Sequence, residues 1–429
     1  MLNIKFIREN PDLIKKNLEK RNQEEKKEWI DKILANDTRW RSLKQKSEKL
    51  RNKRNTLTQE IKELKKKGQD IAPRLKLAKE IPSKIQAMEC EMDELQKQNI
   101  SYQQQFPNIL HESTPIGKSE EDNVPFNFYI EGPKKPKFEL RSHVDILEKS
   151  SLANFEAGRK NAGQGFNYLL GDMARLDLAL QNYGVNYLTK KGFQLIGTPL
   201  MLNKDALYGA VNFEDFRDVI YKVEGEDLHL IGTGEHPLVA LFRNKTFNKK
   251  DLPIKICTLT PCFRKEIGGH GVDSKGIFRM HQFYKVEQVI ISNQEDSYTH
   301  LEEMQKISED FFKSMKIPFR VIKICSGDLG PKMSKQYDIE AWYPREQKYK
   351  EVTSAGNTTK YQAVKLNTKY IDEEGNKKYV HMLNNTMVAT SRAMVAILEN
   401  FQNEDGTINV PKPLRKYMNK KKIGVFQNG

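Results

Sequence analysis

The sequence predicts a long antiparallel helical hairpin followed by an α+β domain built around an antiparallel sheet. Apolar residues recur at alternating spacings of three and four between residues 27 and 66, and again between 78 and 95, which is typical of two paired helices. From about Leu140 onward, aromatic residues and glycines become more frequent and strand-like runs alternate with helical ones. The 429 residues can bury cores for two or three domains. We expect one domain over residues 1–110, with the hairpin at about 27–105, and a second over 111–429.

The hairpin is predicted from two apolar seams and the break between them. The first seam consists of Trp29, Ile33, Trp40, Leu43, Leu50, Leu57, Ile61 and Leu64, interrupted by Asn36, Ser47 and Arg54. The second consists of Ala78, Ile81, Ile85, Met88, Met92 and Leu95. Gly68 and Pro73 separate them, and Pro82 is expected to kink the second helix. At ~1.5 Å per residue, the hairpin forms an arm roughly 60 Å long.

Positive charge is concentrated on this predicted arm. The chain carries a formal charge of +15, and residues 41–80 hold 14 Lys plus Arg against 5 Asp plus Glu, a net of +9. A basic surface binds phosphate backbones through counterion release. Lysine-rich helices also serve simply as solvated faces, and helical hairpins commonly act as dimerisation or spacing elements. Charge alone leaves these alternatives open.

Composition excludes several other classes of protein. No run approaches the ~18 apolar residues needed to span a bilayer, and residues 1–10 lack the apolar core of a signal peptide. The four cysteines are scattered without metal-ligand spacing, which suits a reducing compartment and gives no zinc signal. We therefore expect a cytoplasmic protein with no membrane segment.

The segment from Pro253 to Ile291 contains the most informative pattern. Two apolar runs flank Gly268-Gly-His-Gly271 and Gly276, which predicts two strands joined by a glycine-rich loop. Arg264 and Glu266 stand two residues apart, so on a strand they would share one face and could clamp a phosphate and a neighbouring donor group. This indicates a nucleotide site, although a polar hairpin with a satisfied Arg–Glu pair has the same short pattern.

The full order of residues here resembles the second signature motif of class II aminoacyl-tRNA synthetases, and within them the seryl-tRNA synthetases. It reads Phe263-Arg-Lys-Glu266, then a loop, then Arg279-Met-His-Gln-Phe283 and Lys285-Val-Glu287. The opening Met1–Leu13 and the basic arm also resemble that family, so the resemblance covers essentially the whole chain. It implies a cytosolic class II catalytic domain over 111–429 that joins L-serine to tRNA(Ser) through seryl-adenylate. Related enzymes also charge tRNA(Sec).

The resemblance also assigns roles to partners and subunits. The arm would grip the long variable arm of the tRNA. Lys191–Pro199 resembles the first class II motif, which implies a homodimer in which the arm of one subunit serves the active site of the other.

By the same resemblance, two arginines and a metal site would carry the chemistry. Arg264 would contact the α-phosphate of ATP and orient the serine carboxylate, and Arg392 would meet the γ-phosphate. Glu351 and Ser354 would hold Mg²⁺, a hard cation that takes oxygen ligands. Fixed cations are needed because the transition state concentrates negative charge on phosphorus. The implied catalytic residues are Arg264, Glu351 and Arg392, and the implied ATP-binding residues are Arg264, Glu266, Met280, Phe283, Glu351, Val352, Thr353, Ser354 and Arg392.

Within that set, Glu266 would hold the adenine amino group and Phe283 would stack on the adenine ring. The resemblance also implies a serine pocket. A buried carboxylate such as Glu287 suits serine because alanine would leave its acceptors unpaired. Threonine differs from serine by one extra methyl group, and excluding that group contributes a smaller discrimination of ~1–3 kcal/mol. The implied serine-binding residues are Thr233, Gly234, Glu235, Arg264, Glu287, Asn384 and Thr386. We interpret His236, His270 and His281 as structural, since the reaction needs no protein general base.

The chain departs from the family in one region. Many members have Ser-Ser-Cys-Ser-Asn where this chain has Thr353-Ser-Ala-Gly-Asn357, and Lys360 stands where an Asp is usual. Val364 and Lys365 replace the usual paired arginines. These changes bear on local packing and nucleotide affinity.

Two rival functions remain open. One is a paralogue that adenylates a small amino acid and loads it on a carrier other than tRNA; such relatives tend to lack the arm. The other is a non-catalytic RNA-binding or scaffolding protein. Such a protein would be indicated by the loss of Arg264, Glu351 or Arg392. All three are present.

Overall fold

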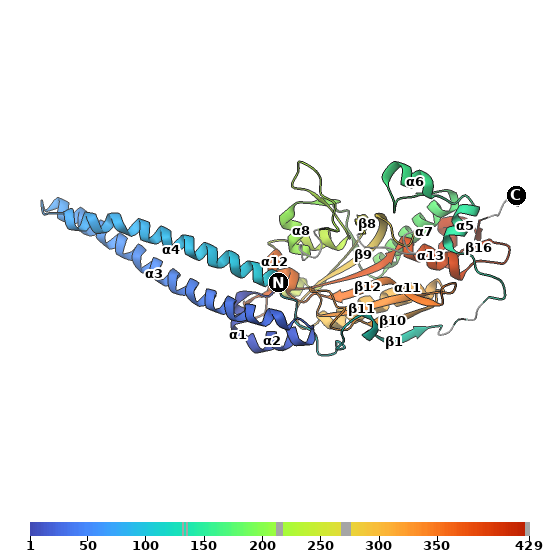
Figure 1. Cartoon of the computed structure of the whole chain (residues 1–429), viewed down its shortest axis with the longest axis horizontal. Coiled ribbons are helices and arrows are strands. Elements are labelled where there is room, and N and C mark those ends of the chain that lie inside the picture. The colour runs from blue at the N-terminus through green and yellow to red at the C-terminus, as the bar shows by residue number, and fades with distance from the viewer. Residues whose placement is uncertain (131–132, 134–135, 212–217, 267–275, 425–429) are drawn as a thin grey trace. The chain divides into compact units, whose positions relative to one another are not determined.

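The computed structural model describes residues 1–130, 133, 136–211, 218–266 and 276–424. These residues form two compact units, Met1–Pro107 and Asn108–Gly429. Figure 1 shows the first unit as a pair of long helices beside two short ones, and the second as a sheet packed with helices.

Four α-helices make up the first unit. They are α1 (Ile4–Glu9), α2 (Pro11–Lys20), α3 (Lys27–Lys66) and α4 (Ala72–Gln105). Gly68, with a φ of +66°, lies in the turn between the long pair, where glycine adopts the left-handed region without steric cost. The predicted antiparallel hairpin is therefore confirmed, and α4 runs on through Pro82 without interruption.

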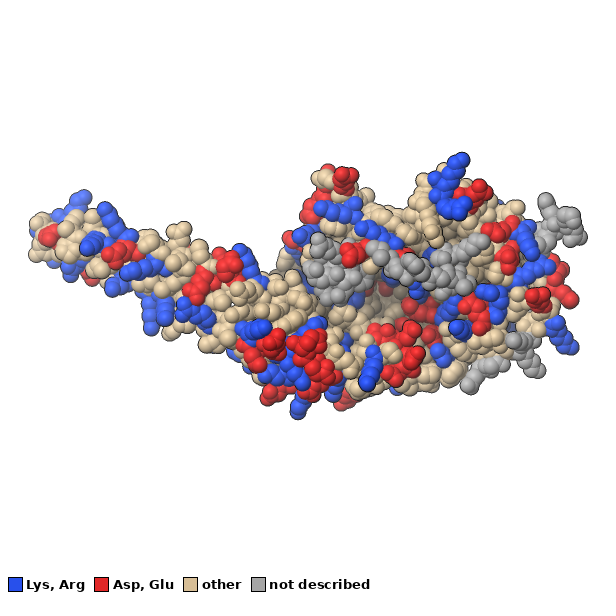
Figure 2. Space-filling view, in the orientation of Figure 1, with Lys and Arg blue, Asp and Glu red and all other residues tan. Residues whose placement is uncertain are grey.

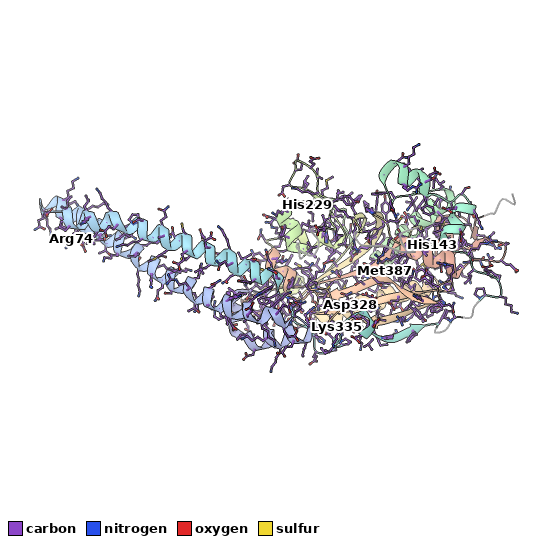
Figure 3. All side chains as sticks on the ribbon, in the orientation of Figure 1. Arg74, His143, His229, Asp328, Lys335 and Met387 are labelled. Atoms are coloured by element: carbon purple, nitrogen blue, oxygen red, sulfur yellow. The ribbon has the colours of Figure 1, made fainter. Side chains whose placement is uncertain are left out.

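The two predicted seams face each other between α3 and α4. Ile33, Leu43, Leu57, Ile81 and Ile85 are buried, and the remaining predicted seam residues are half-buried. Polar contacts cross the same interface: Asn36 Nδ2 donates to Asn99 Oδ1 over 3.1 Å, and Arg74 pairs with Glu60 at 2.9 Å. Figure 3 shows Arg74 near the end of the arm that is remote from α1 and α2.

An eight-stranded sheet forms the centre of the second unit, in the order β1-β10-β11-β12-β15-β9-β8-β4. Every neighbouring pair is antiparallel except β4 with β8. In that order the strands are Val124–Tyr129, Phe319–Lys323, Lys335–Tyr343, Lys348–Asn357, His381–Ala389, Gln282–Ser292, Ile254–Phe263 and Gln194–Leu195. The predicted antiparallel α+β fold is confirmed.

Three helices pack on this sheet and share its main core: α7 (Gly171–Lys190), α11 (Ser297–Ser314) and α13 (Thr390–Asn400). The other α-helices among the described residues of this unit are α5 (His143–Lys149), α6 (Phe155–Ala162), α8 (Lys204–Ala210), α10 (Glu235–Ala240), α12 (Tyr361–Leu366) and α14 (Arg415–Met418). Small two- and three-stranded sheets use β2 (Ala153–Asn154), β3 (Tyr168–Leu169), β5 (Met201–Leu202), β6 (His229–Leu230), β7 (Thr246–Asn248), β13 (Lys369–Ile371), β14 (Lys377–Tyr379), β16 (Ile408–Asn409) and β17 (Lys422–Ile423).

Candidate active site

The predicted hairpin at 253–291 forms as β8 and β9, which pair without a break from Ile254 opposite Ile291 to Phe263 opposite Gln282. One detail of the prediction was wrong: Arg264 and Glu266 do not share a strand face. Strand β8 ends at Phe263, and Glu266 has a φ of +45°, in the left-handed region. The backbone therefore turns after the strand, and strand alternation does not set the directions of the Arg264 and Glu266 side chains. The predicted glycine-rich loop at 268–271, including His270, lies outside the described residues.

A cavity of about 100 Å³ opens beside the end of this hairpin. It brings together seven of the predicted ATP-binding residues, which come from β8–β9, β12 and α13. These are Arg264, Glu266, Met280, Phe283, Glu351, Val352 and Arg392. Phe278, Arg279, Lys285 and Thr386 also line it. Thr353 and Ser354 do not line it.

A β-bulge in β12 explains where Thr353 and Ser354 point. The register with β11 shifts so that Glu351 lies opposite Glu340, Thr353 opposite Ile339 and Ser354 opposite Asp338. Thr353 is 1% exposed on the core face. Because of the extra residue, Glu351 and Ser354 share the other face despite being three positions apart. Asp338 is buried beside them, where burial and the neighbouring Glu351 raise its pKa.

Two of the arginines that line the cavity, Arg264 and Arg392, are held by neighbouring groups. Arg264 Nε donates to the Gly232 carbonyl over 3.0 Å, and its guanidinium lies 5.5 Å from the Phe283 ring centre. Arg392 Nη1 donates to the Glu351 carbonyl over 3.0 Å and lies 2.9 Å from Glu351 Oε2. Burial opposes ionisation of Glu351, but the charge and hydrogen bond of Arg392, together with the charges of Arg264 and Lys285, outweigh it and lower the pKa of that carboxyl. Both cations are therefore held at the cavity wall.

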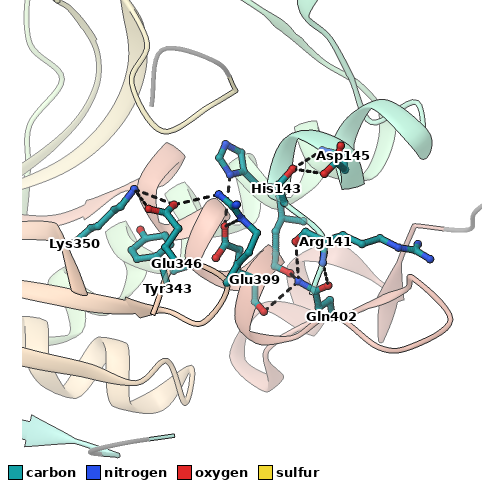
Figure 4. Close-up of polar contacts among 12 residues, drawn as sticks. Arg141, His143, Asp145, Tyr343, Glu346, Lys350, Glu399 and Gln402 are labelled. Atoms are coloured by element: carbon teal, nitrogen blue, oxygen red, sulfur yellow. Dashed lines mark hydrogen bonds and ion pairs between the residues drawn. The ribbon is translucent and has the colours of Figure 1, made fainter. Parts of the chain in front are cut away.

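Aromatic and charged side chains pack around Arg392. The centre of the Phe278 ring lies 5.3 Å from the Arg392 guanidinium carbon and 4.9 Å from Lys350 Nζ. Tyr343 packs edge-on against Phe278, and its hydroxyl donates to the Arg392 carbonyl over 3.1 Å. Figure 4 shows Lys350 and Tyr343 beside Glu346, with Lys350 Nζ 2.8 Å from a Glu346 oxygen. These contacts fix the orientation of the cavity wall.

The predicted serine-binding residues on β9 and β15 meet next to the cavity. Glu287 is 2% exposed, and Thr386 Oγ1 donates to its Oε2 over 3.3 Å. Lys285 Nζ lies 2.5 Å from the same oxygen and donates to Thr386 over 3.2 Å. Burial nevertheless raises the pKa of Glu287 above its ordinary value. Since Lys285 and Thr386 also line the cavity, these two side chains connect the buried Glu287 carboxylate to the cavity wall.

A second buried carboxylate, Glu235, begins α10. Lys332 Nζ lies 2.5 Å from Glu235 Oε1, and Gln362 Nε2 donates to that oxygen over 2.6 Å. Burial opposes ionisation, yet Lys332 and the other cations lower the pKa of Glu235 to about 2. The preceding Gly234 has no room for a side chain, because a Cβ there would lie 2.6 Å from Thr258 Cγ2. Thr233 Oγ1 accepts from the Glu235 amide over 3.2 Å and lies 3.5 Å from Glu287 Oε2.

Asn384, a further predicted serine-binding residue, lies on the same strand as Thr386. It precedes Asn385 and Thr386 on β15 and lies opposite Val289 of β9. Its Nδ2 is buried without a hydrogen-bond partner among the described residues. An unpaired buried donor costs about 1–3 kcal/mol, so a ligand acceptor at this atom would be favourable.

The departures from the family are accommodated by local packing. A Cβ on Gly356 would lie 2.5 Å from Met333 Sδ, so the glycine makes room for that side chain. Lys360 precedes α12, and its charge acts on His381. His281 Nδ1 lies 2.5 Å from the Tyr221 hydroxyl, and the His281 ring packs on Phe166.

Sequence reasoning missed Lys285 and Lys332 as pocket residues. Lys285 stands two positions before Glu287, so strand alternation places both on one face, and this signal was available. Lys332 carried no such signal.

The sheet order, the β8–β9 hairpin and the strand-to-helix run at β15–α13 define the core of a class II aminoacyl-tRNA synthetase. The family model for the class II core domain of the G, H, P, S and T synthetases matches residues 220–401, and the model for the seryl-tRNA synthetase N-terminal domain matches residues 1–110. The chain belongs to the seryl-tRNA synthetase family.

Three similar proteins illustrate this membership. A serine–tRNA ligase from Methanoregula boonei is 45% identical over 98% of this chain and 99% of its own length. The crystal structure of seryl-tRNA synthetase from Pyrococcus horikoshii complexed with ATP has a TM-score of 0.93 at 44% identity, covering 99% of this chain and 100% of that one. The cytoplasmic serine–tRNA ligase of Naegleria fowleri in complex with AMP has a TM-score of 0.87 at 34% identity, covering 100% and 99%.

Proposed function

We propose that the second unit activates L-serine with ATP to form seryl-adenylate and then transfers the seryl group to tRNA(Ser). The observation that carries this proposal is the direct contact between the wall of the cavity and the buried carboxylate of Glu287. Arg264 and Arg392 line a cavity of about 100 Å³, and Thr386 connects that cavity to the buried Glu287. A nucleotide phosphate and an amino acid bound there would be adjacent, which an adenylation reaction requires.

The chemistry follows from the positions of the charges. Arg264 would contact the α-phosphate and the serine carboxylate, and Arg392 would contact the terminal phosphate. Negative charge developing at phosphorus would then meet cations that need no reorganisation. Glu287, with Thr233, Glu235 and Asn384, would accept or donate the hydrogen bonds of the serine ammonium and hydroxyl groups. Glu266 would hold the adenine amino group, and Phe283 would stack on the adenine.

Magnesium would be held by Glu351 and Ser354. The bulge in β12 puts their oxygens on one face next to the buried Asp338, and this set of oxygen donors fits a hard divalent cation. When bound, Mg²⁺ would neutralise phosphate charge.

The first unit would bind tRNA through its arm. Figure 2 shows Lys and Arg side chains spread along the arm, with Asp and Glu between them. The match to the seryl-tRNA synthetase N-terminal domain supports this role. We expect the domain division at about residue 110, and a cytoplasmic location. None of the described helices is long and apolar enough to cross a membrane.

A homodimer is part of this proposal. The edge strand β4 lies in the segment that resembles the first class II motif, and Leu195 in it is 48% exposed. Met201 and Leu200 nearby are 44% and 36% exposed. Light scattering on the purified protein should give twice the chain mass.

Charging of total tRNA with labelled serine tests the proposed function. We expect serine to be esterified to a subset of the tRNA in the presence of ATP and Mg²⁺. Adenylate formation without any tRNA charging would favour the carrier-loading paralogue. Binding of tRNA with neither reaction would favour a scaffold.

A further inference from the structure

Lys332 lies outside every motif that predicts the site, in the segment before β11. Its ammonium reaches Glu235 on α10, with Nζ 2.5 Å from Oε1, and both side chains are largely buried, at 16% and 6% exposed. A buried carboxylate needs a charge partner or hydrogen bonds to stay ionised. Lys332 supplies that charge within the amino-acid pocket.

Both groups that hold the Glu235 carboxylate contact the same oxygen, Oε1. Gln362 Nε2 donates to Oε1 over 2.6 Å and to the Ala210 carbonyl over 2.7 Å, so the amide is itself fixed. Within the described parts of the chain, no hydrogen bond reaches Oε2 of Glu235 from another side chain. Two donors on Oε1 therefore set the orientation of the carboxylate and leave Oε2 for a ligand.

The backbone that carries Lys332 is anchored on both sides. Asn108 Nδ2 donates to the Lys332 carbonyl over 3.0 Å, and the Asn108 amide donates to the Pro331 carbonyl over 2.7 Å. The next residue, Met333, fills the space above Gly356. The lysine thus starts from a fixed backbone and is not a surface side chain that reaches the carboxylate by chance.

We propose that Lys332 is a positioning residue for amino-acid recognition: it holds Glu235 by Oε1 and so presents Oε2 to the ammonium or hydroxyl group of the bound amino acid. This inference rests on the proposed function. Lys332 acts through Glu235 and does not line the cavity that contains Arg264 and Arg392, so the nucleotide half of the site should not respond to its loss.

The test compares Lys332→Met with Lys335→Met in the full-length protein. Lys335 is a matched control, because it is a buried lysine in the same segment whose Nζ lies 2.9 Å from Glu302, which is no part of the pocket. In serine-dependent ATP–pyrophosphate exchange, Lys332→Met should raise the KM for serine by at least about tenfold, with the KM for ATP within about twofold of wild type. Lys335→Met should leave both KM values unchanged.

A double-mutant cycle separates positioning from a general structural role. In a Glu235→Gln background, Lys332→Met should change the KM for serine by less than about twofold, because its partner is already neutral. Lys332→Arg should retain more serine affinity than Lys332→Gln, which covers the case in which the Met variant does not fold. An unchanged serine KM in folded Lys332→Met, or a full effect in the Glu235→Gln background, overturns the inference. Wild-type protein without serine-dependent exchange would instead overturn the proposed function.

Discussion

Glu351 and Ser354 lie on the same face of β12 although three positions separate them. The bulge opposite Ile339 and Glu340 inserts one residue, so Ser354 returns to the face of Glu351 and Thr353 turns into the core. The strand thereby turns Glu351 and Ser354 to one face, where the proposed Mg²⁺ would bind, and buries Thr353 on the other face.

This relationship predicts opposite outcomes for two neighbouring substitutions. Ser354→Ala should raise the Mg²⁺ concentration needed for half-maximal pyrophosphate exchange by roughly tenfold, because it removes a metal ligand. Thr353→Val should leave it unchanged, since the Thr353 hydroxyl is buried without a partner among the described residues and valine has nearly the same shape. Equal magnesium titrations for both variants would contradict the assignment.

The Met333 side chain occupies the space that a side chain at position 356 would need. Gly356→Ser should lower the free energy of unfolding by about 1–3 kcal/mol by overpacking. Adding Met333→Ala should recover at least half of that loss. Urea unfolding of the two variants and of Met333→Ala alone measures this coupling. A Gly356→Ser protein as stable as wild type would show that Met333 moves freely.

His381 should make stability depend on pH. Burial, with a contribution from Lys360, lowers the pKa of His381 to about 4. In the unfolded chain His381 binds a proton near pH ~6.5, whereas in the folded protein it stays neutral down to about 4, so stability falls as pH falls between those values.

The variant His381→Gln isolates that contribution, because all other titrating groups are shared. Between pH 7.5 and 5.0 wild type should lose about 2 kcal/mol more than the variant in the free energy of unfolding. Equal losses would mean that His381 titrates alike in both states.

The arm should contribute to tRNA affinity and not to adenylation. Lys65, Lys66 and Lys67 lie at the end of α3 next to the turn. Replacing all three with alanine should weaken tRNA binding and lower the salt dependence of log K by roughly 0.7–0.9 for each phosphate that the variant no longer neutralises. Serine-dependent exchange without tRNA should be unchanged. Replacing Glu60 and Glu63 on the same stretch provides a control with opposite charge effect, and a fall in exchange for the lysine variant would contradict separate roles for the two units.

The arm and the hairpin were predictable because their signals are local. A seam with a period near 3.5 and a glycine turn are visible within 80 residues of sequence, and the buried Ile33, Leu43 and Ile85 lie where that period puts them. The strand runs at β8 and β9 were visible for the same reason.

What could not be predicted depends on tertiary contacts. A period of two places Glu351 and Ser354 on opposite faces, and only the register with β11 reveals the bulge. Lys332 meets Glu235 across 97 positions of sequence, so no local pattern marks it. The prediction that Arg264 and Glu266 share a strand face was wrong because β8 ends at Phe263, one residue before Arg264.

Amino-acid-dependent ATP–pyrophosphate exchange on the purified protein tests the central claim most directly. Serine should be compared with threonine, alanine, glycine and cysteine at equal concentrations. We predict strong exchange with serine, exchange with alanine and glycine lower by at least about a hundredfold, and a smaller margin against threonine, of about 10–200-fold. No exchange with any amino acid from folded protein, or stronger exchange with an amino acid other than serine, would contradict the assignment of this site to serine activation.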